Sequence, residues 1–249
     1  MMQHMKIATW NVHRRNKKTL KGVQVLMAEH DVLCLQEINE KVLEDVLKVA
    51  PHNYVSDECT WRGGKSYIVT LSKHPITDGE CIQHKHWRSL RNILKGQKEG
   101  RYFQRVDIEH KGTDWRVVNA HLPLNVSPFC RMCEWARIWG TTNKNHTRNI
   151  ICGDFNTFAG PLWALFVGPF MGFRLKDLFL NERNLMQKYI ERSEFVNPLK
   201  AKKRTHAQVP YQLDFLLHQT VHETKEFKRW PKRLGSDHWP LSLHVKLGD

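Results

Sequence analysis

Polar side chains capable of chemistry stand at the ends of apolar, strand-like runs in this sequence. Functional groups commonly gather where the strands of a rigid scaffold end, so residues placed in this way are candidates for one shared site. A turn residue or a helix cap explains any one of them alone, but not the whole set. The set comprises Asn11 in TWNVH, Glu37 in VLCLQE, His121 after WRVVNA, Asp154 and Asn156 after NIICG, Asp214 inside LDFLL, and Asp237 with His238 before WPLSLHV.

The residue types in this set suit the hydrolysis of a phosphate ester. Carboxylate and amide oxygens are hard ligands that favour Mg²⁺ or Mn²⁺, whereas zinc favours Cys and His. His121 and His238 accompany these oxygen donors. A histidine that titrates near neutral pH can transfer a proton or stabilise an oxyanion. A divalent metal, carboxylates and histidines together can position a nucleophile and neutralise the charge that develops on phosphate.

The elements that position these residues alternate between strand-like and helix-like patterns. We expect strands over 6–12, 32–35, 67–71, 104–108, 115–120, 149–152, 212–217 and 241–245, with a hairpin turn at Gly112. Helices are expected over 20–30, from an Asn39 cap to Pro51, from Ser127 onward, and over 181–191. Many short strands interleaved with few helices predict an α/β sandwich of two packed sheets, and we expect one domain over 1–249.

The helix that begins at Ser127-Pro128 is expected to bury one stripe of its surface. Proline is favoured at the first helical position, so this dipeptide is a clear start signal. Helical spacing predicts an inner face of Phe129, Met132, Cys133, Ala136 and Trp139.

The ordered series TWNVH, LQE, NAHLP, GDFN, LDF and SDHWP resembles the endonuclease/exonuclease/phosphatase superfamily. Its members include pancreatic-type deoxyribonucleases and abasic-site endonucleases. The resemblance runs from Thr9 to Pro240, with GDFN and SDHWP as its most specific pieces. It implies a four-layer α/β sandwich, in which two packed mixed sheets are flanked by helices and the site lies where both sheets meet.

The resemblance also implies a metal site. Glu37 would be the principal ligand of Mg²⁺, with Mn²⁺ as a substitute. Asn11 would assist, and Asp237 would contribute directly or through water.

The resemblance assigns the remaining residues to catalysis. Asp154 would orient or deprotonate the attacking water, and Asn156 would hold that water or a phosphate oxygen. His238, oriented by Asp214, would contact the scissile phosphate. His121 would stabilise the phosphate or protonate the leaving oxygen. An acid inside an apolar run, as Asp214 is, is costly unless it is paired, and a histidine is a natural partner.

Two positions depart from the superfamily pattern. His13 stands where many relatives carry a metal-site residue two positions after the asparagine. The segment RGGKSYIV has no carboxylate that could orient His121, as deoxyribonuclease-like relatives have. The general-acid role of His121 is thereby weakened, whereas its role as an electrostatic contact is not.

The chain is strongly basic, with 39 Lys+Arg against 25 Asp+Glu and a formal net charge of +14. Such a surface attracts polyanions, of which nucleic acid is the commonest and an anionic membrane surface the second. Basic segments border the motifs at 13–18, 84–105, 199–206 and 225–233, and those at 84–105 and 225–233 contain aromatic residues. The side chains expected to bind nucleic acid are Arg14, Arg15, Lys17, Lys18, Arg88, Arg91, Arg101, Lys202, Lys203 and Arg204.

These features predict a Mg²⁺-dependent endonuclease or nickase that acts on DNA with little sequence specificity. An enzyme of the same fold acting on inositol phosphates, lipids or RNA is the alternative, and a catalytically silent binding module is a third. For the lipid alternative, Pro161–Phe173 could form a membrane-facing loop, although a buried helix and turn is favoured.

Other sequence features bear on where the protein acts. No apolar run approaches the length of a membrane span, and the N-terminus has no signal-peptide pattern, so we expect a soluble intracellular protein. The six cysteines are expected to be reduced. Cys130 and Cys133 form a CxxC motif without a second pair for zinc, which leaves a redox role as a minor alternative.

Overall fold

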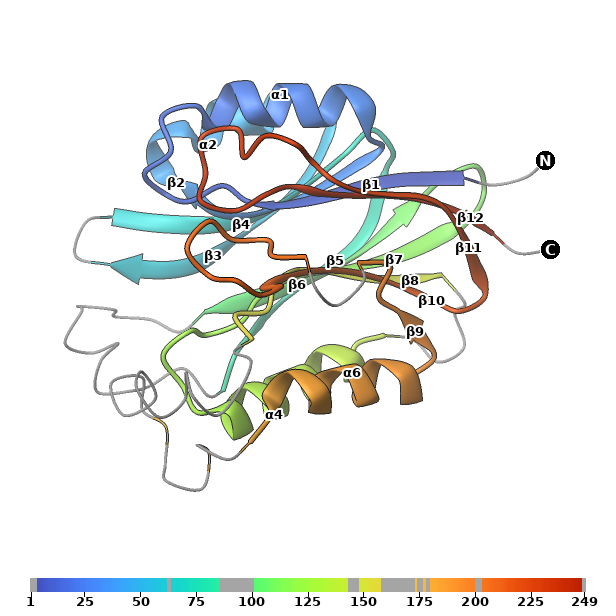
Figure 1. Ribbon diagram of the computed structural model, residues 1–249. Coiled ribbons are helices and arrows are strands. Elements are labelled where there is room, and N and C mark those ends of the chain that lie inside the picture. Colours follow the sequence, from blue (N-terminus) through green and yellow to red (C-terminus); the bar gives the residue numbers. More distant parts are fainter. Residues whose placement is uncertain are drawn as a thin grey trace.

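Two six-stranded mixed sheets pack face to face in the computed structural model, with helices on both outer faces (Figure 1). The structure describes residues 4–61, 64–85, 101–142, 148–157, 173, 177, 180–199 and 203–247. The arrangement is the expected α/β sandwich of two packed mixed sheets flanked by helices, so that prediction is confirmed.

The first sheet carries helices α1 (Thr19–Glu29) and α2 (Glu40–Leu47) on its outer face. Its strands lie in the order β11 (His222–Arg229), β12 (Leu241–Leu247), β1 (His4–Asn11), β2 (Val32–Asn39), β4 (Gly64–Ser72) and β3 (His52–Trp61).

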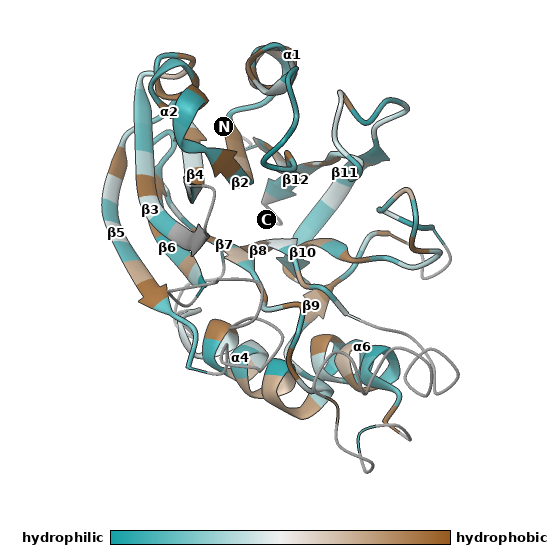
Figure 2. Cartoon of the chain, turned by 90° about the vertical axis from the view of Figure 1, so that its left-hand side faces the viewer, coloured by the Kyte–Doolittle hydropathy of each residue, from teal (hydrophilic) through white to brown (hydrophobic). Residues whose placement is uncertain are grey.

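The second sheet carries α4 (Pro128–Gly140) and α6 (Glu182–Arg192) on its outer face, and Figure 2 shows all four layers from one end of the molecule. Its strands lie in the order β5 (Ile76–Gln83), β6 (Tyr102–Glu109), β7 (Asp114–His121), β8 (Asn149–Asp154), β10 (Asp214–Gln219) and β9 (Phe195–Val196).

One parallel strand pair in each sheet explains why the polar strand ends meet. β1 runs parallel to β2, so that Asn11 lies opposite Gln36. β7 runs parallel to β8, so that His121 lies opposite Asp154. β10 is antiparallel to β8, and the residue that begins it, Asp214, lies opposite Asp154. The carboxyl ends of the parallel strands therefore share one edge with the start of β10.

Alternating side chains build separate apolar layers. Ile7, Val32, Val117, Ile150 and Leu216 belong to the cluster that fills the space between the sheets. The intervening residues of the same strands face the helices and form two further clusters. Because successive residues of a strand point to opposite faces, both faces of the central strands are buried and these strands read as continuous apolar runs.

A buried polar network joins the two sheets just below the shared edge. Gln36 Nε2 donates to Asn119 Oδ1 at 2.7 Å, and Asn119 Nδ2 donates to Thr70 Oγ1 at 3.3 Å. Thr70 Oγ1 in turn donates to Gln104 Oε1 at 2.9 Å, and Gln104 Nε2 donates to Ser56 Oγ at 2.8 Å. Gln36 directly precedes Glu37, so bonds between the sheets fix the backbone that carries a candidate ligand.

The buried face of α4 differs from the expected one. Phe129 is 59% exposed, whereas Arg131 and Glu134 are fully buried beside Trp135 and Ile138. Arg131 donates to both carboxylate oxygens of Glu182 at 2.7 and 2.8 Å. The prediction of an inner face of Phe129, Met132, Cys133, Ala136 and Trp139 was therefore wrong except for Trp139. Ion pairing allows charged residues to occupy a face that an apolar pattern would not reveal.

Gly153 occupies a position in β8 that no other residue can fill without strain. Its φ is +126°, and an added Cβ would lie 1.9 Å from the carbonyl oxygen of Ala120. We expect Gly153→Ala to lower the free energy of unfolding by about 3 kcal/mol or more. Gly140→Ala is the matched control, because no described atom outside the adjacent residues and the helix's own backbone lies within 4 Å of the added Cβ there. Urea denaturation of both variants checks this, and equal stabilities would contradict it.

The described residues bear on three further sequence features: membrane spans, the segment 161–173 and the cysteines. In the described part of the chain, no helix is long and apolar enough to cross a membrane. The segment 161–173, discussed above as membrane-facing or buried, lies outside the described residues except for Phe173. The described cysteines Cys34, Cys81, Cys130, Cys133 and Cys152 are free thiols.

Candidate active site

A continuous chain of contacts links the polar strand ends at the shared edge of the sheets. Asn11 Nδ2 lies 3.4 Å from Glu37 Oε1 and 3.0 Å from Asp154 Oδ2. Asp154 Oδ2 lies 3.5 Å from His121 Nε2 and 3.7 Å from His238 Nε2. These residues come from four strands of both sheets and from the loop before β12, yet they meet in one place.

Glu37 stands at an irregular point of β2. Its φ is +61°, and the pairing of β2 with β4 shifts register between Leu35 and Ile38. Such a bulge re-aims a side chain at the end of a strand. The carboxylate receives the backbone N–H of Arg14 at 3.3 Å and remains 20% exposed. It is therefore held in place but open to solvent, as a ligand to an exchangeable cation must be.

Asp154 occupies the buried centre of the cluster. Its Oδ1 accepts the backbone N–H of Asn156 at 2.9 Å, while its Oδ2 accepts Asn11 Nδ2. Burial raises the pKa of Asp154, and the nearby Asp214 charge adds to that effect, although the histidines oppose it. A carboxylate of raised pKa is a stronger proton acceptor and is suited to a general base.

Asn156 lies in the same turn and has a φ of +48°. Its Nδ2 donates to the carbonyl oxygen of Leu122 at 2.8 Å, which fixes the amide against the end of β7. The turn after β8 is thereby tied to the segment that carries His121.

His238 and Asp214 form a buried pair. His238 Nδ1 donates to Asp214 Oδ2 at 2.8 Å, and Nε2 faces Asp154. Burial alone would lower the pKa of His238, but the charges of Asp214 and Asp154 outweigh it and raise the pKa to about 10. The ring is therefore an imidazolium at neutral pH, held with Nε2 toward the centre of the cluster.

Asp237 lies at the more open side of the cluster and has a partner that the sequence did not indicate. Its Oδ2 lies 3.3 Å from His206 Nε2, and its carboxylate is 33% exposed. Burial would raise the pKa of Asp237, but the hydrogen bond from His206 and the His238 charge hold it well below its usual range. His206 reaches this place because its backbone pairs with that of His238, which no local spacing could predict.

His121 contacts a cation, Arg101, in addition to the carboxylate of Asp154. Arg101 Nη1 donates to His121 Nε2, and both side chains are buried. Burial, reinforced by the Arg101 charge, lowers the pKa of His121 to about 3. A neutral ring that accepts a hydrogen bond at Nε2 favours electrostatic positioning over proton donation to a leaving oxygen.

The basic side chains expected on the surface occupy several different environments. Arg101 is buried against His121 at the edge of the catalytic cluster, and its predicted contact with nucleic acid stays a prediction. Arg14 is half-buried, whereas the exposed cations are Arg15, Lys17, Lys18, Lys203 and Arg204. Arg88, Arg91 and Lys202 lie outside the described residues.

The oxygen donors of the cluster fit a divalent cation. Glu37 and Asp237 are partly exposed carboxylates, and hard oxygen donors of this kind suit Mg²⁺ or Mn²⁺. Two groups of ligand atoms within 4.8 Å of one another also occur in the described chain: His206, Asp237 and His238, and Asp154, Asp214 and His238. Both contain His238, which already donates to Asp214.

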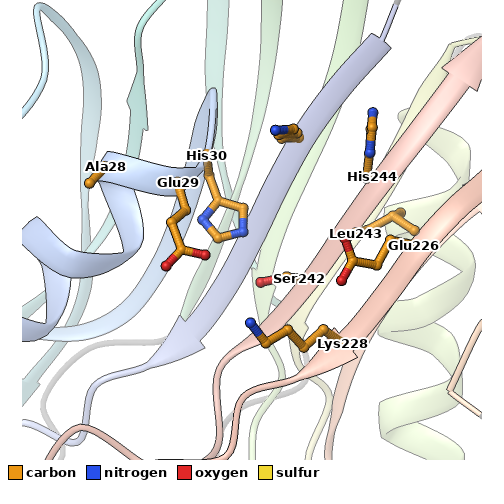
Figure 3. Close-up of a pocket in the computed structure, with 9 residues that line it drawn as sticks. Ala28, Glu29, His30, Glu226, Lys228, Ser242, Leu243 and His244 are labelled. Carbon is orange, nitrogen blue, oxygen red and sulfur yellow. The ribbon is translucent and has the colours of Figure 1, made fainter.

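A pocket elsewhere contains none of these residues. It lies between the end of α1 and strands β1, β11 and β12, and Figure 3 shows Glu29, His30, Lys228, Ser242 and His244 lining it. Its lining mixes acidic and basic side chains, so it presents no single charge to a ligand. The chemistry-bearing cluster is therefore separate from this pocket.

Solved structures of other proteins share this fold. Solved structures with the same fold include an endonuclease/exonuclease/phosphatase from Beutenbergia cavernae, which is 16% identical, with a TM-score of 0.75 and coverage of 99% of this chain and 72% of that one. The endonuclease domain of TRAS1, a telomere-specific non-LTR retrotransposon, is 12% identical, with a TM-score of 0.60 and coverage of 99% and 100%.

A third solved structure, the Bacteroides thetaiotaomicron mannosyl-6-phosphatase Bt3783, is 11% identical, with a TM-score of 0.65 and coverage of 97% and 99%. No curated protein sequence matches the chain significantly. The model of the Endonuclease/Exonuclease/phosphatase family matches residues 8–238, a span that contains every residue of the cluster. The chain therefore belongs to the endonuclease/exonuclease/phosphatase family.

Proposed function

We propose that this protein is a Mg²⁺-dependent endonuclease that nicks DNA with little sequence specificity. The family consists of hydrolases that act on phosphate esters, and its solved members include a retrotransposon endonuclease domain. The observation that carries the proposal is the single cluster in which Asn11 bridges Glu37 and Asp154, with His238 beside Asp154. Little specificity is expected because the described residues form one sandwich, without a separate domain for reading base sequence.

In this proposal, Glu37 holds the metal with help from Asn11 and Asp237. The bound cation supplies positive charge at the scissile phosphate. Asn11 also bridges the metal side of the cluster to Asp154, because its amide contacts both carboxylates.

The proton and the phosphate are handled by the buried residues. Asp154 takes the proton of the attacking water at Oδ2, the oxygen that faces His121 and His238. The His238 imidazolium, fixed by Asp214, places positive charge at a non-bridging phosphate oxygen. Asn156 orients the water or the phosphate, and Arg101, held by His121, adds positive charge at the same edge.

The positive charge of the chain supports nucleic acid as the substrate. The net charge is +14, and exposed Arg15, Lys17 and Lys18 directly follow the strand that carries Asn11. Cations near the catalytic edge favour a long polyanion, because each phosphate contact releases counterions and adds affinity.

A phosphatase or phosphodiesterase acting on inositol phosphates, lipids or RNA is the second candidate. The relatedness of the fold to a mannosyl-6-phosphatase supports it, because the same scaffold carries phosphomonoester chemistry there.

Removal of the metal tests the proposal, because plasmid nicking by this protein should require a divalent cation. We expect purified protein to convert supercoiled plasmid to the nicked form in Mg²⁺, to retain activity in Mn²⁺, and to lose it in EDTA. The expected loss is at least about a hundredfold, because the cation neutralises developing charge. Intact plasmid in Mg²⁺, alongside phosphate release from inositol phosphates or lipids, would contradict the endonuclease and support the second candidate.

A further inference from the structure

Three arginines surround one tryptophan beside the catalytic cluster. The guanidinium carbon of Arg229 lies 4.7 Å from the centre of the Trp239 ring, and those of Arg204 and Arg233 lie 5.4 Å from it. Cation–π attraction of this kind orients the guanidinium groups against the ring. We name Arg204, Arg229, Arg233 and Trp239 the Trp239 arginine cluster.

The charge of this cluster is not balanced by acids in the described structure. Arg229 Nη1 donates to the backbone carbonyl of Arg204 at 3.0 Å, which is a neutral acceptor. Within the described ranges, no carboxylate forms an ion pair with Arg204, Arg229 or Arg233. Like charges gathered at one place repel one another, and a bound anion would relieve that repulsion. Guanidinium groups match the geometry of phosphate oxygens.

The cluster is attached to the same two loops that hold the catalytic residues. The backbone N–H of Trp239 donates to the carbonyl oxygen of Thr205 at 2.9 Å, next to the backbone bridge between His206 and His238. Thr205 Oγ1 accepts the backbone N–H of Asp214 at 2.9 Å. Arg204 directly precedes Thr205, and Trp239 directly follows His238. An anion bound by the cluster would therefore adjoin the scissile phosphate.

Arg229 and its neighbour Lys228 lie on opposite faces of β11. Arg229 lies opposite Leu241, a residue of the core between the sheets, whereas Lys228 lies opposite Ser242. Figure 3 shows Lys228 and Ser242 at the pocket below α1, on the outer face of the sheet. Adjacent strand residues point to opposite faces, so Arg229 belongs to the inner side, toward the second sheet.

We propose that the Trp239 arginine cluster binds the backbone phosphates that flank the scissile phosphate in a nucleic-acid strand. This inference rests on the proposed endonuclease function and names the part of the protein that holds the strand. A phosphomonoester carries a single phosphate, which the catalytic residues themselves engage. Three further guanidinium groups next to them fit a substrate with additional phosphates on one side of the reacting one.

Binding without turnover tests the cluster directly. The protein is titrated in EDTA against a fluorescein-labelled single-stranded oligonucleotide, and anisotropy is followed over a range of KCl concentrations. Each lost phosphate contact lowers the slope of log K against log salt by about 0.7 for a single strand. We expect the triple variant Arg204→Gln, Arg229→Gln, Arg233→Gln to lower the slope by about two and to weaken binding at least about tenfold.

Lys228→Gln is the matched control, because it removes the same charge from the adjacent residue on the other face. It also loses a cation–π contact, since Lys228 Nζ lies 4.8 Å from the Trp230 ring. We expect its slope and affinity to equal those of the wild type. Arg229→Lys keeps the charge and should keep the slope. If the triple variant unfolds, the three single variants are tested in its place, and each should lower the slope by about 0.7.

A small substrate distinguishes this inference from the proposed function. Bis(p-nitrophenyl) phosphate has no flanking phosphate, so the triple variant should hydrolyse it at the wild-type rate. Unchanged oligonucleotide binding in the triple variant would overturn the inference even if the wild type nicks plasmid, as would an equal loss of small-substrate hydrolysis. A wild type that binds oligonucleotide through the cluster but never nicks plasmid would overturn the endonuclease and leave the binding site standing.

Discussion

Replacing Glu37 with alanine should abolish metal-dependent hydrolysis and leave the protein folded. Glu37 supplies the most exposed carboxylate that contacts Asn11, and its loss removes the principal charge that would hold a divalent cation. Without that cation, the negative charge that develops on the phosphate is not neutralised, and we expect turnover to fall by about a thousandfold or more. Plasmid nicking in Mg²⁺ measures the loss.

Glu44→Ala is the matched control for this variant. Glu44 is an exposed residue of α2 on the outer face of the same sheet, so the change removes one carboxylate without touching the cluster. Both variants should melt within a few degrees of the wild type. Undiminished nicking by a folded Glu37→Ala protein would show that another residue holds the metal.

His238→Ala should reduce turnover by at least about a hundredfold, the usual scale for loss of proton transfer or oxyanion stabilisation. The imidazolium is buried between Asp214 and Asp154, and both carboxylates raise its pKa to about 10. Its removal deletes a positive charge from the place where the phosphate would lie, while the metal side of the cluster is untouched. Metal binding should therefore survive, which a Mn²⁺ titration can measure.

The control for His238→Ala is His244→Ala on β12. His244 lines the pocket below α1 in Figure 3, away from the catalytic edge, and should be dispensable for turnover. Asp214→Asn adds a second arm, because it removes the charge partner of His238 but keeps a hydrogen-bond acceptor. It should lower turnover less than His238→Ala does. A His238→Ala protein with wild-type turnover would remove this residue from the mechanism.

The central strands and their polar ends could be predicted because both signals are local. β2 and β8 are buried on both faces and read as continuous apolar runs, each followed by an acid. The expected cap at Asn39 is present, and Ser127 and Asn181, where two further helices were expected to begin, also accept a backbone N–H at the start of a helix. The order of the motifs along the chain was then sufficient to identify the family.

The edge strands could not be predicted because they have no buried face. β5 and β11 are mostly exposed, so their sequences lack the alternation that marks a half-buried strand. The predicted inner face of α4 was wrong because charged residues occupy the buried face of that helix. Arg131 is buried by pairing with Glu182, 51 positions away, and no periodicity records such a partner.

Nonlocal contacts also decide the details of the site. Arg101 looks like one more cation in a basic segment, yet folding places it against His121. His206 contacts Asp237 only because two distant loops pair at His206 and His238. The arginines around Trp239 come from two separate segments of the chain, 199–206 and 225–233, and only their packing makes them one surface.

The position of the metal tests the central claim most directly. A crystal of the protein grown with Mn²⁺ and a non-hydrolysable phosphorothioate oligonucleotide would reveal the cation by anomalous diffraction. We predict an anomalous peak on the Glu37 carboxylate, with a phosphate oxygen between that peak and His238 Nε2. A peak remote from Glu37, with the strand bound elsewhere on the protein, would contradict it.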